Sequence, residues 1–178
     1  MRSDAAQAIT ELREAGLGVA MLSGDRRSAA EHIGRGIGLD DITAECTPQA
    51  KIEHVAGRRA RGDTVAVVGD GINDAPALAA ADVGIAIGGG TDLAREVSDV
   101  TLLGDRLLQI PWALRLARRT HRAIRQNLAW AFGYNVIAMT LAFLGYLHPL
   151  LAARLMLGSN VFVLDNSLRL GRSDAAGP

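Results

Sequence analysis

The sequence predicts an α/β fold with a parallel, doubly wound sheet, followed by a hairpin of two long apolar helices. Up to about residue 105, helical patterns alternate with short apolar runs that suit buried strands. Loops rich in glycine, serine and aspartate follow several of these runs, as expected where parallel strands end at a binding site. After about residue 110 the chain becomes strongly apolar. We therefore expect two domains, at 1–110 and 111–178.

The first part begins with a helix at 5–15, where apolar residues recur at helical spacing before Gly16. An apolar run at 17–22 then suits a buried strand. Pro48 suits the first turn of a later helix, which Gly62 ends. The remaining elements are helices at 27–36, 75–81 and from about Thr91, a short strand at 43–46, and strands at 64–68 and 83–87.

The second part resembles a transmembrane hairpin. Residues 127–147 contain no charged side chain and are about long enough to cross a bilayer, and the run at 149–168 reaches a similar length. A basic cluster at 115–125 forms a juxtamembrane helix before the first run, and further arginines follow the second. Both sets of positive charge would then lie on the cytoplasmic side, with the first domain. The alternative is a pair of buried core helices in a soluble protein.

Charge and cysteine content limit the possible partners. Lys+Arg 19 balance Asp+Glu 19, so the total charge does not indicate nucleic acid. The basic cluster directly precedes an apolar run, which favours anionic membrane lipid as its partner. The single cysteine, Cys46, excludes an internal disulfide and suits a reducing compartment. Lys51 is the only lysine in the chain.

The run VVGDGINDAP at 67–76 places two carboxylates at the end of a predicted strand. Asp70 follows the strand directly, and Asp74 begins the next helix. Paired carboxylates are hard-oxygen ligands that suit Mg²⁺, and Asn73 between them can donate to a phosphoryl oxygen. Aspartate at such positions is also common in turns and helix caps, and for Asp74 alone capping would be the better interpretation.

Two further elements are expected at the same site. The loop Ser23-Gly24-Asp25 follows a predicted strand, where a hydroxyl and backbone N–H groups can bind a phosphate. Lys51, near the start of a helix, can bring a point positive charge to that phosphate. Each alone would be an ordinary loop serine or surface lysine. Together with the two aspartates they predict a Mg²⁺-assisted phosphoryl-transfer site.

These motifs resemble the haloacid-dehalogenase-like superfamily, and specifically the heavy-metal (copper-type) P-type ATPases. The resemblance covers nearly the whole chain, and its matching segments are MLSGD at 21–25, TPQAK at 47–51, VGDGINDAPALAAADVGIAIGGGTD at 68–92, ARRTHRAIRQNLAWAFGYN at 117–135 and VLDNSLRL at 163–170. It implies that 1–110 is a partial haloacid-dehalogenase-like phosphorylation domain. The two apolar runs would then be the last two membrane helices.

The resemblance also implies roles for the residues of the predicted site. Ser23 would contact the phosphoryl group, Lys51 would neutralise it, and Asp70 with Asp74 would serve the Mg²⁺ site. The remaining members of the site are Gly24 and Asp25, which complete the loop, and Asn73, which helps to hold the phosphate. ATP would be bound mainly by a domain that this chain does not contain.

Four residues on the two apolar runs resemble a site for the transported ion. Copper-type members carry a Tyr-Asn pair on one membrane helix and a Met-x-x-Ser-Ser pattern on the next. This chain has Tyr134, Asn135, Met156 and Ser159 at those positions, but Asn160 replaces the second serine. Thioether and amide ligands would suit a soft monovalent cation such as Cu⁺. Packing is the ordinary role of a lone methionine, and the identity of the metal stays open.

The motif that carries the phosphorylated aspartate is missing. P-type ATPases form an aspartyl-phosphate on an Asp-Lys-Thr-Gly motif, and this sequence contains none. We therefore expect a carboxyl-terminal fragment of an ATP-driven heavy-metal exporter that is inactive without its amino-terminal part. The alternative is a short protein that acts as a membrane-anchored binding or regulatory module without catalysis.

Overall fold

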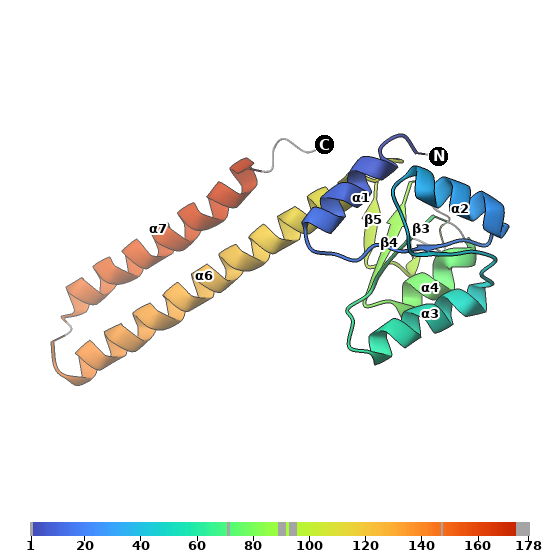
Figure 1. Cartoon of the computed structure of the whole chain (residues 1–178). Helices are drawn as coiled ribbons and strands as arrows, with labels where there is room; N and C mark the ends of the chain where they lie inside the picture. The colour runs from blue at the N-terminus through green and yellow to red at the C-terminus, as the bar shows by residue number, and fades with distance from the viewer. Residues whose placement is uncertain (1, 71, 89–91, 93–95, 147, 174–178) are drawn as a thin grey trace. The chain divides into compact units, whose positions relative to one another are not determined.

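The computed structural model describes residues 2–70, 72–88, 92, 96–146 and 148–173 (Figure 1). Contacts within the chain divide it into two units, Met1–Pro111 and Trp112–Pro178. The expected helix near Thr91 falls mostly outside the described residues.

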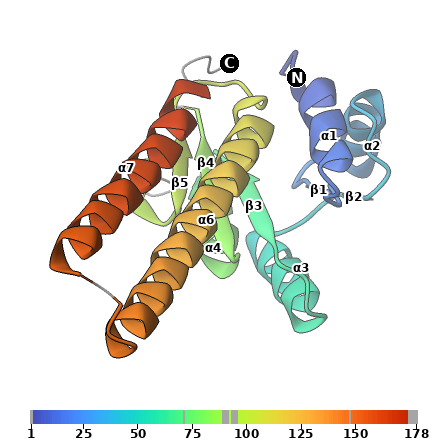
Figure 2. The ribbon, with the colours of Figure 1, turned by 90° about the vertical axis from the view of Figure 1, so that its left-hand side faces the viewer.

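The first unit is built on parallel strands, as the sequence predicted. Strands β3 (Ala66–Gly69), β4 (Val83–Ile87) and β5 (Val100–Leu102) form a three-stranded parallel sheet in the order β3-β4-β5 (Figures 1 and 2). Strands β1 (Met21–Leu22) and β2 (Ile42–Thr43) form a separate parallel pair. The α/β class and the parallel arrangement are confirmed, but the described strands form two sheets rather than one.

Helices α3 and α4 pack together and cover the three-stranded sheet on one side (Figure 1). Val55 of α3 and Leu78 of α4 are each 1% exposed and lie at the centre of the core. The helical elements of this unit are α1 (Ala5–Glu14), α2 (Arg27–Gly36), α3 (Pro48–Ala60), the 3₁₀ turn η1 (Ile72–Asp74) and α4 (Ala75–Ala80).

Three strands differ from the sequence-based expectation. The strand expected at 43–46 is β2, which covers only Ile42–Thr43. Only Met21 and Leu22 of the run at 17–22 pair, because β2 offers just two positions for a ladder. Strand β5 was not expected from the sequence, since it is only three residues long. Its register is fixed by Asp99, whose N–H donates to the Gly84 carbonyl at 2.9 Å and whose carboxylate accepts from Gly84 N–H at 2.8 Å.

The second unit contains two long helices, α6 (Gln109–Phe143) and α7 (Pro149–Ser173). The basic cluster and residues 127–143 of the first apolar run belong to one continuous helix of 35 residues. The two helices contact each other through Trp130 and Phe162, whose ring centroids are 4.6 Å apart. A polar contact joins them as well, because Asn166 donates to Asn127 Oδ1 at 2.7 Å.

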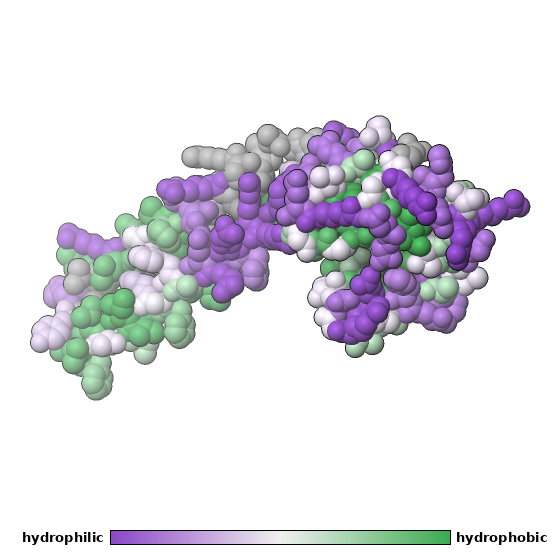
Figure 3. Space-filling model, in the orientation of Figure 1, coloured by the Kyte–Doolittle hydropathy of each residue, from purple (hydrophilic) through white to green (hydrophobic). Residues whose placement is uncertain are grey.

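The predicted transmembrane hairpin is not confirmed. Among the described residues, no helix combines the length and the apolar character that a membrane crossing needs. The first predicted run, 127–147, extends beyond the end of α6 at Phe143, and it includes the polar residues Asn127 and Asn135. Hydrophobic side chains nevertheless gather over the parts of α6 and α7 that lie near the turn between them (Figure 3).

Candidate functional site

The carboxyl ends of the three parallel strands bring three loops to one edge of the sheet. Strand β3 ends at Gly69, β4 at Ile87 and β5 at Leu102. Because the strands are parallel and adjacent, the loops that begin at Asp70, Gly88 and Leu103 emerge side by side. This is the edge at which ligands bind in open parallel sheets.

Lys51 and Asp74 form a short, partly buried ion pair at this edge. Lys51 Nζ lies 2.6 Å from Asp74 Oδ1, and the two side chains are 15% and 24% exposed. The structure therefore brings together two residues that the sequence predicted for one site. A charge-assisted hydrogen bond in such a partly buried place is stronger than a surface ion pair.

The start of α3 explains the position of Lys51. Thr47 caps this helix by accepting a hydrogen bond from the N–H of Ala50 at 3.1 Å, and Pro48 occupies the first turn. Lys51 N–H then donates to the Thr47 carbonyl at 3.1 Å. The cap thus fixes the helical turn from which the Lys51 side chain reaches Asp74.

Asp74 does not act as a helix cap. It occupies the N-cap position of α4, but its side chain accepts no capping hydrogen bond. The capping interpretation is therefore wrong for this residue, since the carboxylate binds Lys51 instead.

Gly69 is a site residue that sequence reasoning missed. A Cβ added at Gly69 would lie 2.6 Å from the Asp74 Cβ and 3.1 Å from Asp74 Oδ2. Real Cβ atoms do not approach so closely, so only glycine lets β3 end directly against Asp74. The sequence signal was the glycine directly before Asp70.

Gly69→Ala is therefore expected to lower the free energy of unfolding by about 1–3 kcal/mol, because the added methyl group must push Asp74 away. Urea unfolding of the purified chain measures this change. Gly57→Ala is the matched control, since Gly57 lies inside α3 with nothing within 4 Å of the added Cβ. That variant should gain about 0.5–1 kcal/mol. Equal changes in the free energy of unfolding of the two variants would contradict the close approach of Gly69 to Asp74.

Asp70 is an open carboxylate of the predicted site. Its side chain is 63% exposed, and Arg2 Nη2 lies 3.3 Å from its Oδ2. Arg2 also approaches Asp105, at 3.7 Å. Sequence reasoning missed both of these residues. Asp105 follows the end of β5 as Asp70 follows β3, but the signal was hidden because β5 itself was not expected.

The loop at Ser23 is ordered by its own hydrogen bonds. Asp25 N–H donates to Ser23 Oγ at 3.1 Å, and the Ser23 hydroxyl donates to Asp25 Oδ2 at 3.1 Å. The Ser23 carbonyl accepts from Cys46 N–H at 2.9 Å, which places this loop beside the residues that precede α3. Gly24 faces the Cys46 carbonyl, 3.4 Å from where its Cβ would be.

The predicted site is thus only partly assembled. Within the residues that the structure describes, no hydrogen bond joins the side chains of Ser23 or Asp25 to Lys51 or Asp74. Asn73 lies in η1 with an exposed side chain.

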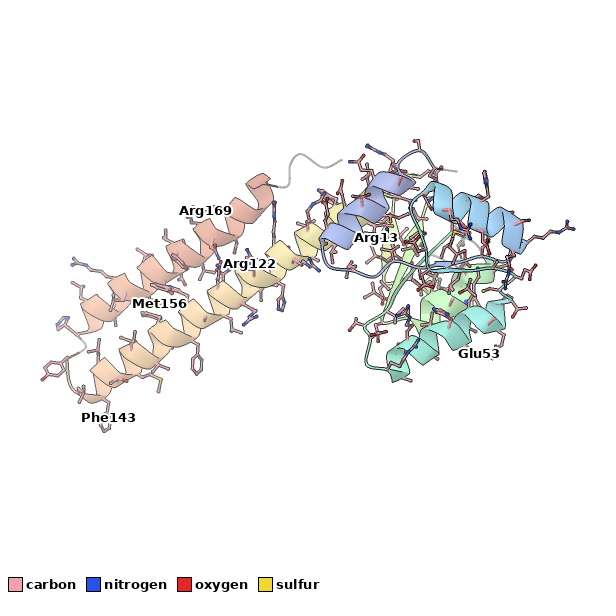
Figure 4. The ribbon with its side chains drawn as sticks, in the orientation of Figure 1. Arg13, Glu53, Arg122, Phe143, Met156 and Arg169 are labelled. Atoms are coloured by element: carbon pink, nitrogen blue, oxygen red, sulfur yellow. The ribbon has the colours of Figure 1, made fainter. Side chains whose placement is uncertain are left out.

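The residues predicted for a transported ion lie on the two long helices. Tyr134 and Asn135 belong to α6, and Met156 and Ser159 belong to α7 (Figure 4 labels Met156). Asn135 is exposed, and Met156 is 59% exposed. In the described part of the chain, no group of three or more His, Cys, Asp or Glu side chains could hold a metal ion.

Comparison with known proteins identifies relatives along almost the whole chain. Cation-transporting P-type ATPase B of Mycobacterium tuberculosis (strain ATCC 25618 / H37Rv) is 48% identical over 170 residues, which are 96% of this chain and 23% of the relative. The copper-exporting P-type ATPase of Staphylococcus aureus (strain Newman) is 46% identical over 96% of this chain and 21% of its own length. The chain is therefore homologous to a segment of the P-type ATPases. It spans less than a quarter of the length of these curated P-type ATPases.

Fold comparison supports the same P-type ATPase family. The crystal structure of a zinc-transporting PIB-type ATPase in the E2.Pi state matches with a TM-score of 0.88 and 40% identity, over 96% of this chain and 28% of that chain. The family description "haloacid dehalogenase-like hydrolase" matches residues 1–82. The first unit thus has the haloacid-dehalogenase-like fold that the motifs implied.

Proposed function

We propose that this chain contributes the magnesium- and phosphate-binding part of the phosphorylation site to an ATP-driven heavy-metal cation exporter. The observation that carries this proposal is the partly buried Lys51–Asp74 pair at the edge of the sheet where the exposed Asp70 also lies. The P-type ATPase relatives, named as cation-transporting and copper-exporting, support the assignment.

The carboxylates at this edge fit a magnesium ion. Mg²⁺ binds one or two protein carboxylates and keeps several waters, so it needs an accessible oxygen donor at an open site. Asp70 supplies such a donor, since most of its side chain is exposed. One oxygen of Asp74 accepts from Lys51, and its other oxygen would be a second donor to the ion. When bound, Mg²⁺ would supply charge neutralisation for a transferring phosphoryl group.

The other residues of the site would hold the phosphoryl group. Lys51 brings a positive charge, and its bond to Asp74 keeps the ammonium at the edge of the sheet. The Ser23 hydroxyl and the Gly24 N–H are donors on a loop that Asp25 orders, and the exposed Asn73 amide is another donor. Because these 178 residues contain no Asp-Lys-Thr-Gly motif, the aspartate that accepts the phosphoryl group, and most of the ATP site, would come from another part of the exporter. The chain alone would therefore not hydrolyse ATP.

The long helices are proposed to lie in a membrane, with the first unit on the cytoplasmic side. Many large apolar side chains of α6 and α7 are exposed, among them Phe132, Met139 and Phe143 at 71%, 73% and 92%. A surface of this kind needs apolar cover, which lipid or other membrane helices supply. The basic cluster on α6 would contact anionic headgroups. The hydrogen bonds of Asn127 with Asn166 and Ser167 satisfy polar groups between the helices, as membrane helices require.

The expressed chain is therefore expected to sediment with membranes and to resist extraction at alkaline pH, because its exposed apolar side chains hold it in lipid. Fractionation and immunoblotting measure this. A variant that ends before Gln109 serves as the control and should appear in the supernatant. Full release of the intact chain by alkaline carbonate would contradict the membrane proposal.

The transported cation is proposed to contact Tyr134, Asn135, Met156 and Ser159, with Cu⁺ as the first candidate. Sulfur and amide donors favour a soft monovalent ion. The zinc-transporting neighbour makes Zn²⁺ the competing candidate.

This proposal predicts metal-stimulated ATP hydrolysis in a chimera. In that chimera, the chain replaces the matching residues of the S. aureus copper-exporting ATPase, and Cu⁺, Ag⁺, Zn²⁺, Cd²⁺ and Co²⁺ are compared. Met156→Ala and Asn135→Ala should each reduce stimulation by the preferred ion about tenfold, because each removes a ligand or its support. Met139→Ala, on an exposed face of α6, is the control and should have little effect. An unchanged response of all three variants would assign Met156 and Asn135 to packing.

A further inference from the structure

Arg2 lies between two acidic loops at the carboxyl edge of the sheet. Its Nη2 atom is 3.3 Å from Asp70 Oδ2 and 3.7 Å from Asp105 Oδ1. The Arg2 side chain is 29% exposed, whereas those of Asp70 and Asp105 are 63% and 79% exposed. One partly buried guanidinium therefore forms ion pairs with two carboxylates that are exposed to solvent.

The segment that carries Arg2 is tied to the loop that carries Asp105. Asp4 Oδ2 accepts a hydrogen bond from the backbone N–H of Leu108 at 3.0 Å. The Arg2 carbonyl accepts from the N–H of Ala5, the first residue of α1, at 3.3 Å. These bonds hold Arg2 beside Asp105 independently of its contact with Asp70.

Gly88 leaves space for an approach of Arg2 to Asp105. Its φ is +72°, a conformation that favours glycine. A Cβ at this position would collide with Asp105 Oδ1 and would lie 3.7 Å from Arg2 Nη2. The absence of a side chain here keeps the space between β4 and the Asp105 loop open to the guanidinium.

We propose that Arg2 is an exchangeable counter-ion, which neutralises Asp70 in the cation-free protein and pairs with Asp105 alone once Mg²⁺ binds Asp70. The inference rests on the proposed magnesium role of Asp70. A divalent cation on Asp70 repels the guanidinium, and Asp105 accepts the displaced charge. Both ion pairs are exposed and therefore weak, so the exchange needs little free energy. Arg2 is thus a positioning residue that sets the cation affinity of Asp70.

Calorimetric titration of the full chain with Mg²⁺ at low ionic strength tests the exchange, because it measures the dissociation constant of the ion. Arg2→Ala should lower the dissociation constant about threefold, since Asp70 loses its competing cation. Asp105→Asn should raise it about threefold, because Arg2 then has only Asp70 as a partner. Arg13→Ala removes an arginine whose partner, Asp40, is distant in sequence from this edge, and it should leave the constant unchanged.

A change in net charge alone would also lower the dissociation constant in Arg2→Ala and raise it in Asp105→Asn. The double variant distinguishes this general charge effect from an effect of Asp105 that acts through Arg2. If Asp105 acts through Arg2, Asp105→Asn should have no further effect in the Arg2→Ala background. An equal effect in both backgrounds would overturn the inference. Arg2→Lys keeps the positive charge, so it should restore most of the dependence on Asp105.

Amide NMR shifts supply a second measurement that does not depend on activity. In the unmodified chain, the Asp105 amide should shift with the same Mg²⁺ dependence as the Asp70 amide. In Arg2→Ala the Asp105 shift should be lost while the Asp70 shift remains. A shift at Asp70 with none at Asp105 in the unmodified chain would refute the exchange but leave the proposed function intact. Unchanged Mg²⁺ binding by Asp70→Asn would instead refute the magnesium role itself.

Discussion

Asp70→Asn should reduce Mg²⁺-dependent ATP hydrolysis by about 100-fold or more in a chimera of this chain with a copper-exporting relative. Asparagine keeps the size of the side chain but removes the negative charge that a divalent cation needs. The Asp70 side chain is 63% exposed, so the substitution leaves no buried group without a partner. The measurement is phosphate release as a function of Mg²⁺ concentration.

Two controls belong to this experiment. Asp63→Asn changes an aspartate that pairs with Arg58 on the surface, and it should leave turnover within about twofold of the original. The chain alone should not be labelled by radioactive ATP, because it contains no Asp-Lys-Thr-Gly motif. Near-normal turnover of Asp70→Asn would remove the magnesium assignment.

Lys51→Ala is expected to abolish turnover of the same chimera and also to destabilise the chain by about 1–2 kcal/mol. The loss of stability follows because Asp74, only 24% exposed, is left without its partner. The loss of turnover follows because Lys51 is the only lysine of this chain and is the residue proposed to bring a positive charge to the phosphate. Urea unfolding of the chain and phosphate release by the chimera measure the two effects.

The double variant Lys51→Ala/Asp74→Ala separates stability from function. Removing both partners should recover much of the lost stability, since no unpaired charge remains, but turnover should stay absent. Arg58→Ala, which breaks exposed ion pairs with Asp41 and Asp63, is the control and should cost at most about 0.5 kcal/mol. If Lys51→Ala and Arg58→Ala lower the free energy of unfolding equally, the partly buried Lys51–Asp74 pair contributes no more to stability than exposed ion pairs do.

The alternation of apolar runs and helical patterns was enough to predict the parallel α/β class. Runs such as 83–87 are apolar throughout, and they form strands because both faces of a parallel sheet are buried. Strand β5 escaped prediction because three residues carry no detectable periodicity. The continuity of α6 was also missed, since the change from a basic to an apolar surface suggests a boundary that the backbone does not have.

The members of the candidate site were easier to predict than their contacts. Local motifs identified Lys51 and Asp74, but only the packing of α3 against α4 decides that they touch. The pairing of Arg2 with Asp70 joins residues 68 positions apart, and no local pattern encodes such a contact. The steric role of Gly69 depends in the same way on where Asp74 folds back.

The position of Lys51 has a practical consequence. Apart from the chain terminus, this protein offers one primary amine to an acylating or alkylating reagent, and that amine lies in the candidate site. Reductive methylation with ¹³C-formaldehyde would therefore place a single lysine reporter next to Asp74, without any substitution. Its resonance would follow the site through each titration, and its rate of modification would show how often the bond to Asp74 opens.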